Sequence, residues 1–212
     1  AAASAGPGWR RAVMREWRLL QAARPPGIHV VACQARMDLL RAVIEGPAGT
    51  PYAHALFVVD VLLPPDYPSS PPLLHYHSFG DRVNPNLYES GKVCLSLLGT
   101  WAGVGPELWR AQGSSVLQVL VSLQALVLVR EPYFNEPGYE VDRGTPRGRE
   151  ASHSYSESAR LLTLRHCALM AERPPAGCEA LTRDHFREAG PRVLAEARRM
   201  LAAGRAARDA AA

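Results

Sequence analysis

RVNPNLYESGKVCLSLL, residues 82–98, lies near the middle of a chain of 212 residues. It belongs to a longer segment, residues 78–112, in which Asn, Gly and Pro recur and neither a helical nor a strand period survives. A structureless loop of this length is uncommon inside a compact domain, and long loops tend to carry function. The segment is therefore the first place to look for a functional site.

Four short apolar runs precede this segment. They predict β-strands over residues 28–33, 37–44, 56–63 and 73–77. Gly and Pro breakers, such as Gly46-Pro47 and Pro64-Pro65, separate the runs. Because short turns and no helix join them, the runs predict a four-stranded antiparallel meander.

Helical patterns lie on both sides of the strands and the loop. Residues 9–23 predict an amphipathic helix, which Pro25-Pro26 ends. Residues 114–129 predict a helix with a serine cap, apolar on nearly all sides and therefore buried. Further helical patterns cover residues 154–172, 178–188 and 191–203. The predicted fold class is α+β (α/β).

The composition indicates roughly one large globular domain with some extra length. Hydrophobic residues make up 47% and charged residues 21%, which excludes a disordered or collagen-like chain. A net charge of +4 is too small to indicate a nucleic-acid partner. The longest apolar run, residues 116–129, is shorter than the roughly 20 residues that cross a bilayer, so no membrane partner is expected. Four cysteines are too few for a disulfide scaffold and indicate a reducing compartment.

Several motifs follow one another in a specific order. They are a basic first helix, Gly46-Pro47 with Thr50-Pro51-Tyr52, Leu63-Pro64-Pro65-Asp66-Tyr67-Pro68 with Pro71-Pro72, Asn84-Pro85-Asn86, the segment around Cys94, Trp101, and the helices that follow. This order resembles the catalytic (UBC) domain of a ubiquitin-conjugating enzyme over residues 9–203. The runs NPNLY, KVC with SLLGTW, and NE after EPY are most similar to the domains at the end of very large hybrid conjugating-enzyme/ligase proteins. The resemblance implies a UBC fold, with a crossover helix after the active-site loop and extended C-terminal helices.

Cys94 is the candidate nucleophile. Acyl transfer through a thioester needs an accessible sulfur on a rigid turn, and the thiolate, which Lys92 can modestly favour, is the attacking species. Asn86 lies eight residues upstream, across a turn that Ser90-Gly91 makes tight. Its amide can donate to the oxyanion of the tetrahedral intermediate or brace the loop, and both roles stay open. The resemblance implies that Cys94 accepts the C-terminal carboxyl of ubiquitin from an activating enzyme.

The acceptor of the acyl group must be a neutral amine, yet lysine has a pKa of about 10.4 in water. Apolar and aromatic walls lower that pKa, and a carboxylate can orient the amine or take its proton. By resemblance, Tyr88 shapes the channel for the substrate lysine. Glu136 matches the acidic gate residue after the crossover helix, where the family usually has Asp; an ordinary surface acid is the alternative. The resemblance implies no nucleotide, metal or other cofactor.

Two surfaces are candidates for partner contacts. Their residues are Arg11, Arg15 and Arg18 on the first helix, and Val121, Gln124 and Ala125 on the crossover helix. The arginines form either a solvated face or, as the resemblance implies, the face that docks the activating enzyme. The crossover-helix residues either pack in the core or contact the carried ubiquitin.

Three departures from the family pattern concern the loop and the ligases. Asn84 stands where most relatives carry His, so other hydrogen bonds must brace the loop. Ser69 stands where many relatives present a large aromatic to a ligase, and the loop of residues 99–109 is longer than the compact version. The last two weaken the case for docking on standard RING or HECT ligases. They suit an enzyme that selects substrates through further segments of its own.

Three other functions stay open. A conjugating enzyme for another ubiquitin-like modifier is favoured by Cys94-Leu95-Ser96, which resembles the SUMO carrier, and disfavoured by Asn84 and the long loop. A catalytically idle UBC-like binding module would typically lack the cysteine. A cysteine hydrolase would pair Cys94 with a histidine, the candidates being His75, His77 and His153.

The remaining cysteines and one histidine pair have simpler explanations. Cys33, Cys167 and Cys178 are predicted to be small core or partly buried groups. His75 and His77 share one face of a strand, but no further ligands follow at metal-site spacing.

The domain boundaries follow from these elements. We expect a linker remnant over residues 1–8, a UBC catalytic domain with a helical extension over 9–204, and a flexible tail over 205–212. Because the chain begins with Ala rather than Met, we expect a piece of a longer protein. The expected location is the cytoplasm, with the nucleus as an alternative.

Overall fold

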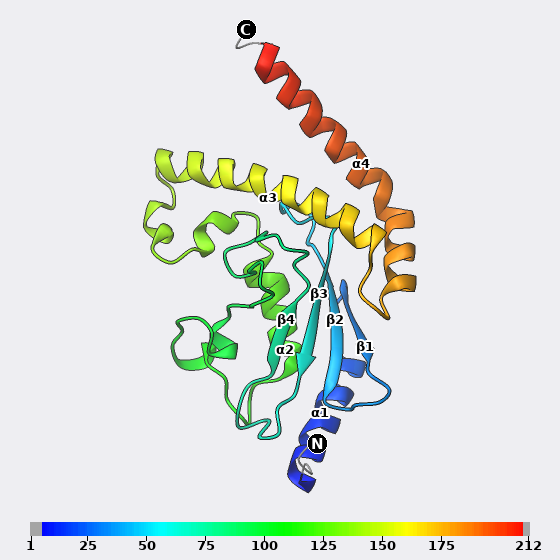
Figure 1. Ribbon diagram of the computed structural model, residues 1–212. Helices are drawn as coiled ribbons and strands as arrows, with labels where there is room; N and C mark the ends of the chain where they lie inside the picture. The colour runs from blue at the N-terminus through cyan, green and yellow to red at the C-terminus, as the bar shows by residue number, and fades with distance from the viewer. Residues whose placement is uncertain (1–5, 210–212) are drawn as a thin grey trace.

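The computed structural model describes residues 6–209, with side chains as far as Arg205. Residues 1–5 and 210–212, the outer parts of the predicted linker and tail, lie outside the described residues. The helices and strands are α1 (Pro7–Ala22), β1 (Ile28–Ala32), β2 (Leu39–Glu45), β3 (Leu56–Leu62), β4 (Leu73–Tyr76), α2 (Val116–Ser122), α3 (Pro146–Glu172) and α4 (Glu179–Asp209). This arrangement confirms the predicted α+β class (Figure 1).

The strands form one antiparallel sheet in the order β1-β2-β3-β4, which confirms the predicted meander (Figure 1). The longest ladder joins β2 and β3, from Leu39 opposite Leu62 to Glu45 opposite Leu56. Every strand boundary lies within two residues of the prediction. The turn residues between the runs therefore located the strands well.

Both faces of the sheet are covered, because side chains of β2 and β3 alternate between two cores. The larger core joins the sheet to α1 and α2, and its central strand members are Ala42, Ile44, Phe57, Val59 and Val61. The smaller core joins the sheet to α3 and the start of α4, and its members are Val43, Leu56, Val58, Met170 and Cys178. Figure 1 shows α3 crossing one end of the sheet. The apolar runs of residues 42–44 and 56–59 are the consequence of this double burial, which ends at the paired Arg41 and Asp60.

A buried carboxylate ties the first helix to the crossover helix. Glu16 of α1 is fully buried, and its Oε2 accepts a hydrogen bond from the backbone N–H of Val116, the first residue of α2, at 2.9 Å. Arg15 donates to the other oxygen at 3.2 Å. Helix N-termini carry unpaired N–H groups and favour negative charge. Glu16 therefore serves as a cap for a helix 100 residues further along the chain.

A buried histidine holds α3 against the sheet. His166 is fully buried, its Nε2 lies 2.9 Å from the carbonyl oxygen of Leu56, and its ring stacks on Phe57 at 5.2 Å. Burial lowers the pKa of His166 to about 4, so the ring is neutral at pH 7. A neutral ring with Nε2 protonated donates to Leu56 while leaving Nδ1 as an acceptor for the hydroxyl of Tyr76 at 3.4 Å.

The crossover helix differs from the prediction in two respects. It ends as a regular helix at Ser122, and a π-helical turn, Leu123–Val127, replaces its last part. The predicted burial on nearly all sides is wrong, since Val121 is 37% exposed and Leu126 is 63% exposed. The helix packs on the sheet along one side only. Its cap is Ser115, whose side chain accepts from the N–H of Gln118 at 3.1 Å.

The C-terminal helices are longer than predicted. Helix α3 begins at Pro146 rather than 154, because Thr145 caps it by accepting from the N–H of Gly148 at 3.0 Å. The helices predicted at 178–188 and 191–203 are a single helix, α4, with Pro191 inside it. An ion pair of Glu188 with Arg192 at 2.9 Å spans that proline.

Two helices extend beyond the predicted domain limits, one at each end of the chain. Helix α1 begins at Pro7, within the predicted linker, and α4 continues through residues 205–209 of the predicted tail. Across residues 6–209, no helix is both long enough and apolar enough to span a membrane.

The capping role of Glu16 can be tested by substitution. We expect Glu16→Ala to lower the free energy of unfolding by about 2–3 kcal/mol, because it leaves a buried N–H without an acceptor. Glu16→Gln keeps an oxygen acceptor and should lose less. Urea unfolding measures both, with the exposed Arg18→Ala on the same helix as the control, expected within about 0.5 kcal/mol of the parent chain. Equal stability of Glu16→Ala and the parent chain would contradict the role.

The buried histidine predicts a pH dependence of stability. Histidine in an unfolded chain has a pKa of about 6.5, so between pH 6.5 and about 4 the unfolded chain binds a proton that folded His166 does not. Stability should therefore fall as the pH decreases through this range, with about 3 kcal/mol of the loss due to His166. Urea unfolding across pH 4–7 measures the loss, and His166→Gln should flatten the curve. The exposed His153→Gln on the same helix should not, and parallel curves for parent and His166→Gln would refute the assignment.

Candidate active site

The Cys94 segment folds back on itself after β4. The backbone N–H of Cys94 donates to the carbonyl of Asn86 at 2.9 Å, across the tight turn that the sequence predicted. Gly91 makes this turn possible, since its φ is +84° and a Cβ there would lie 2.2 Å from the imidazole of His75. The turn therefore needs glycine both for its backbone angle and for the close approach to β4.

The Asn86 amide braces this turn. Its Nδ2 donates to the carbonyl oxygen of Cys94 at 3.0 Å, and the residue is buried. Its Oδ1 is buried and has no hydrogen-bond partner among the described residues. Of the two roles that the sequence left open for Asn86, the geometry shows the brace directly.

Asn84 is the residue at the centre of the loop's hydrogen-bond network. It is fully buried, and its Nδ2 donates to the hydroxyl of Tyr52 at 2.7 Å and to the carbonyl of Val127 at 2.8 Å. Its Oδ1 accepts from the backbone N–H of Asn86 at 2.8 Å. Because Asn84 stands where most relatives carry His, the sequence predicted that other hydrogen bonds brace the loop. The structure shows that Asn84 itself makes these bonds, because an amide offers two donors and an acceptor.

Tyr52 completes that network. Its hydroxyl donates to the carbonyl of Val83 at 3.2 Å. Burial raises the pKa of Tyr52 well above its ordinary value, and the hydrogen bond from Asn84 only partly offsets this. The phenol is therefore uncharged at pH 7, and its hydroxyl can donate.

The sulfur-bearing residue is less accessible than expected. Cys94 is only 2% exposed, although acyl transfer requires the sulfur to be reached. Thr100 fixes the backbone on both sides of it, since its Oγ1 donates to the carbonyl of Val93 at 2.8 Å and accepts from the N–H of Leu95 at 3.0 Å. The backbone on both sides of Cys94 is therefore held by one threonine side chain.

The structure brings the predicted acceptor-side residues, Tyr88 and Glu136, together around Arg82. Arg82 lies between them: its guanidinium carbon is 4.3 Å from the centroid of the Tyr88 ring, and its Nη2 is 3.3 Å from Oε2 of Glu136. Lys92 approaches the same ring at 5.6 Å. Burial, followed by the neighbouring Cys94, raises the pKa of Tyr88.

Glu136 follows a short 3-10 helix, η4 (Pro132–Asn135), that packs beside the π-turn of the crossover helix. Asn135 anchors this segment by donating to the carbonyl of Leu126 at 3.1 Å. The sequence identified Glu136 but missed Arg82. The signal was available, since Arg82 lies two residues before Asn84 in the loop, but only the fold shows which ring and which carboxylate it meets.

The two candidate partner surfaces are exposed to solvent except at one residue of the crossover helix. Arg11, Arg15 and Arg18 are all exposed on α1, as both interpretations of this face require. Val121 and Ala125 are exposed, so the core-packing alternative is wrong for them. Gln124 is half-buried and donates to the carbonyl of Pro26 at 3.3 Å, which makes it partly structural.

A groove leads from the Cys94 segment toward the exposed side of the crossover helix. Its volume is about 460 Å³. Its walls are Leu95, Ser96 and Leu97 on one side, Trp101, Ala102, Pro106 and Glu107 on another, and Gln118, Ser122 and Leu126 of the crossover-helix region on the third. The groove therefore lies between the segment that follows Cys94 and the crossover-helix region.

The two loops that would face a ligase are joined to each other. Trp109, at the end of the long loop, donates its indole N–H to the carbonyl of Pro68 at 2.7 Å, and its ring lies 5.7 Å from Tyr67. Ser69 beside it is exposed and offers no aromatic surface.

The histidines do not form a second catalytic or metal centre. Within residues 6–209, no three His, Cys, Asp or Glu side chains are grouped so as to hold a metal ion. His77 lies 2.8 Å from Asp60, and none of the histidine hydrogen bonds in the described part of the chain involves Cys94. A hydrolase centre pairing Cys94 with a histidine is therefore not assembled.

Two of the other cysteines are core groups, as predicted, and one is not. Cys167 and Cys178 are buried, and burial raises the pKa of Cys167 to about 12, so it is unreactive. The prediction is wrong for Cys33, which lies just after β1 and is exposed.

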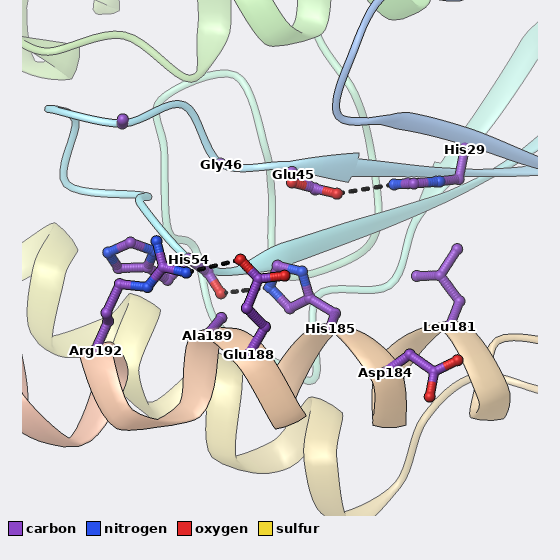
Figure 2. A pocket seen from close by; sticks show the side chains of 11 residues that line it. His29, Glu45, Gly46, His54, Leu181, Asp184, His185, Glu188, Ala189 and Arg192 are labelled. Carbon is purple, nitrogen blue, oxygen red and sulfur yellow. Dashed lines mark hydrogen bonds and ion pairs between the residues drawn. The ribbon is translucent and has the colours of Figure 1, made fainter.

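A polar cleft of about 620 Å³ lies between the sheet and α4 (Figure 2). His29 meets Glu45 at 2.8 Å, His185 meets the carbonyl of His54 at 2.9 Å, and Glu188 pairs with Arg192. These polar groups bind one another or the backbone, and none of the predicted site residues lines the cleft. The cleft lies where α4 meets the sheet, and we assign no catalytic role to it.

Known proteins resemble this chain over most of its length. The ubiquitin-conjugating enzyme family model matches residues 12–162. The "Probable ubiquitin-conjugating enzyme E2 24" of Arabidopsis thaliana is 52% identical over 187 residues, which are 88% of this chain and 21% of that protein. The "Dual E2 ubiquitin-conjugating enzyme/E3 ubiquitin-protein ligase BIRC6" of Homo sapiens is 50% identical over 157 residues, 72% of this chain and 3% of that protein.

The chain thus spans a small part of these relatives, about a fifth of the first. The match covers the sheet, the Cys94 loop, the crossover helix and more than half of α3, which are the elements that build the site described above. The chain belongs to the ubiquitin-conjugating enzyme (E2) family.

Proposed function

We propose that Cys94 carries ubiquitin as a thioester and that the chain transfers it to lysine side chains of substrate proteins. The observation that carries this proposal is the pairing of Cys94 with Asn86 across a glycine turn, in a chain of the E2 family. In loading, the Cys94 thiolate attacks the thioester carbonyl that joins ubiquitin to a cysteine of the activating enzyme. A C–S bond forms at Cys94, and the activating enzyme's cysteine leaves as a thiolate.

Transfer to lysine uses the same carbonyl carbon. The neutral lysine nitrogen attacks it, a C–N isopeptide bond forms, and the C–S bond breaks so that Cys94 leaves as a thiolate. The proton lost by the nitrogen passes to the carboxylate of Glu136 or to water. Tyr88 forms the aromatic wall along which the lysine enters, which disfavours the charged form of the amine.

Asn86 acts in both of the roles that its position permits. In the unloaded enzyme its amide braces the loop through the Cys94 carbonyl. Because its Oδ1 has no partner among the described residues, the amide is bound on one side only. A rotation that releases Nδ2 would aim a donor at the oxyanion of the tetrahedral intermediate, where such donors are most effective.

The partners follow from the exposed surfaces. The arginine face of α1 would receive the activating enzyme, since complementary charge speeds association. The exposed Val121 and Ala125, with Gln124 at their edge, would contact the carried ubiquitin, whose tail would lie in the groove beside Leu95 and Trp101.

We further propose that this chain is the catalytic part of a larger conjugating enzyme that selects its own substrates. The identity with a dual conjugating enzyme/ligase supports this, as does Ser69, which offers no aromatic contact to a separate ligase. The free cysteines fit a reducing compartment, and we propose the cytoplasm.

Charging of Cys94 tests the proposed function. With activating enzyme, ATP and ubiquitin, the chain should form an adduct that reductant removes on a gel. Cys94→Ser should give no such thioester, and Cys94→Lys should give an adduct that resists reductant, because the bond is then an isopeptide. Cys33→Ser, at the exposed cysteine, is the control and should charge normally. No charging of the parent chain, or charging only by another ubiquitin-like modifier with its own activating enzyme, would overturn the proposal.

The oxyanion role of Asn86 predicts a selective loss in the second step. Asn86→Ala should charge nearly as well as the parent chain but discharge to lysine about 100-fold more slowly, as when an oxyanion donor is removed. Single-turnover discharge of the loaded enzyme measures the rate, and a thermal unfolding scan shows whether the loop brace is lost as well. Unchanged discharge would remove Asn86 from the catalytic residues while leaving Cys94 in place.

A further inference from the structure

Arg82 is a charged residue of the active-site loop to which the proposed function assigns no role. Its Nη2 donates to the carbonyl of Pro85 at 2.9 Å, which anchors the guanidinium to its own loop. The same nitrogen lies 3.3 Å from Glu136, 54 residues further along the chain. The guanidinium carbon lies 4.3 Å from the centroid of the Tyr88 ring. Arg82 therefore contacts both residues that the proposed function assigns to the acceptor lysine.

The anchoring makes Arg82 suited to holding these two residues in place. Tyr88 is on the loop and Glu136 follows η4, so their relative position depends on the contact between the two segments. A guanidinium has a planar face for the ring and a fork of donors for the carboxylate, and it is always charged. One side chain can therefore fix both partners at once.

The charges at this position favour an uncharged amine. Glu136 alone would attract a lysine in its charged form, which cannot attack a thioester. Arg82 neutralises that carboxylate, and Lys92 adds a second positive charge near the same ring at 5.6 Å. Like charges disfavour the protonated state of an entering amine, as in enzymes that activate a lysine beside another cation.

We propose that Arg82 is a positioning residue for lysine attack, which holds Tyr88 and Glu136 together and favours the uncharged form of the entering amine. This inference rests on the proposed function. The other titratable groups around the Tyr88 ring and its partner Arg82 are Cys94 and Lys92 on the loop and Glu136 after η4. On α3, burial raises the pKa of Tyr155 to about 12, while Arg82 lowers it and Glu136 raises it by smaller amounts.

Discharge of the loaded enzyme at several pH values tests the inference. Arg82→Gln removes the charge, whereas Arg82→Lys keeps a charge but loses the planar fork. Each variant is loaded with ubiquitin, freed of ATP, and mixed with free lysine at pH 6.5–9.5. Hydroxylamine, a nucleophile already uncharged at neutral pH, serves as a second acceptor.

Arg143→Gln is a matched control. Arg143 also lies over an aromatic ring, 4.4 Å from the centroid of Phe134, and beside a glutamate, 3.8 Å from Glu131, but it does not contact Tyr88 or Glu136 in these pairs. It should charge and discharge like the parent chain.

We expect Arg82→Gln to load normally and to discharge to free lysine about tenfold more slowly at pH 7, with its pH–rate curve displaced by about one unit toward higher pH. Discharge to hydroxylamine should change little, and Arg82→Lys should recover most of the parent pH profile. A parent-like pH profile for Arg82→Gln, or an equal loss with lysine and hydroxylamine, would overturn the role of Arg82. Failure of the parent chain to load would instead overturn the proposed function itself.

Discussion

The buried side chain of Asn84 makes the hydrogen bonds on which the active-site loop depends. With one amide it holds Tyr52, the π-turn of the crossover helix through Val127, and the backbone of Asn86. A buried amide without hydrogen-bond partners would destabilise the fold. The loop is therefore stable only in the conformation that keeps these bonds. The positions of Asn86 and, through the glycine turn, of Cys94 follow from this network.

The scaffold beneath the loop is stabilised by a few buried polar groups that join distant parts of the chain. Glu16 ties α1 to the start of α2, and His166 ties α3 to the sheet. Each is buried, so each must keep its partners for the fold to be stable. Glu16 thus holds the start of the crossover-helix region, and Asn84 holds its far end through the carbonyl of Val127.

The site suits the proposed role of a carrier better than that of a hydrolase. A thioester has to survive until an amine arrives, and the described structure places no histidine in a hydrogen bond with Cys94 that would activate water there. The acceptor side instead combines an aromatic ring, a carboxylate and a fixed cation in Tyr88, Glu136 and Arg82. This combination suits recognition of a lysine whose proton must be lost before it reacts.

Local sequence determined the elements whose signals are themselves local. The four strands, the serine cap of the crossover helix, and the eight-residue separation of Asn86 from Cys94 across Gly91 all depend on neighbouring residues, and all were predictable. Continuous α4 was not, because Ala189 and Val193, on either side of Pro191, are packed against the rest of the protein, and such tertiary packing leaves no local signal. Nor were the burial of Glu16 or the contact of Arg82 with Glu136, since burial and charge pairing over 100 and 54 residues arise only when the chain has folded. The sequence alone thus predicted the fold and a candidate nucleophile, whereas the tertiary structure decided which charges surround it, because long-range contacts leave no local pattern.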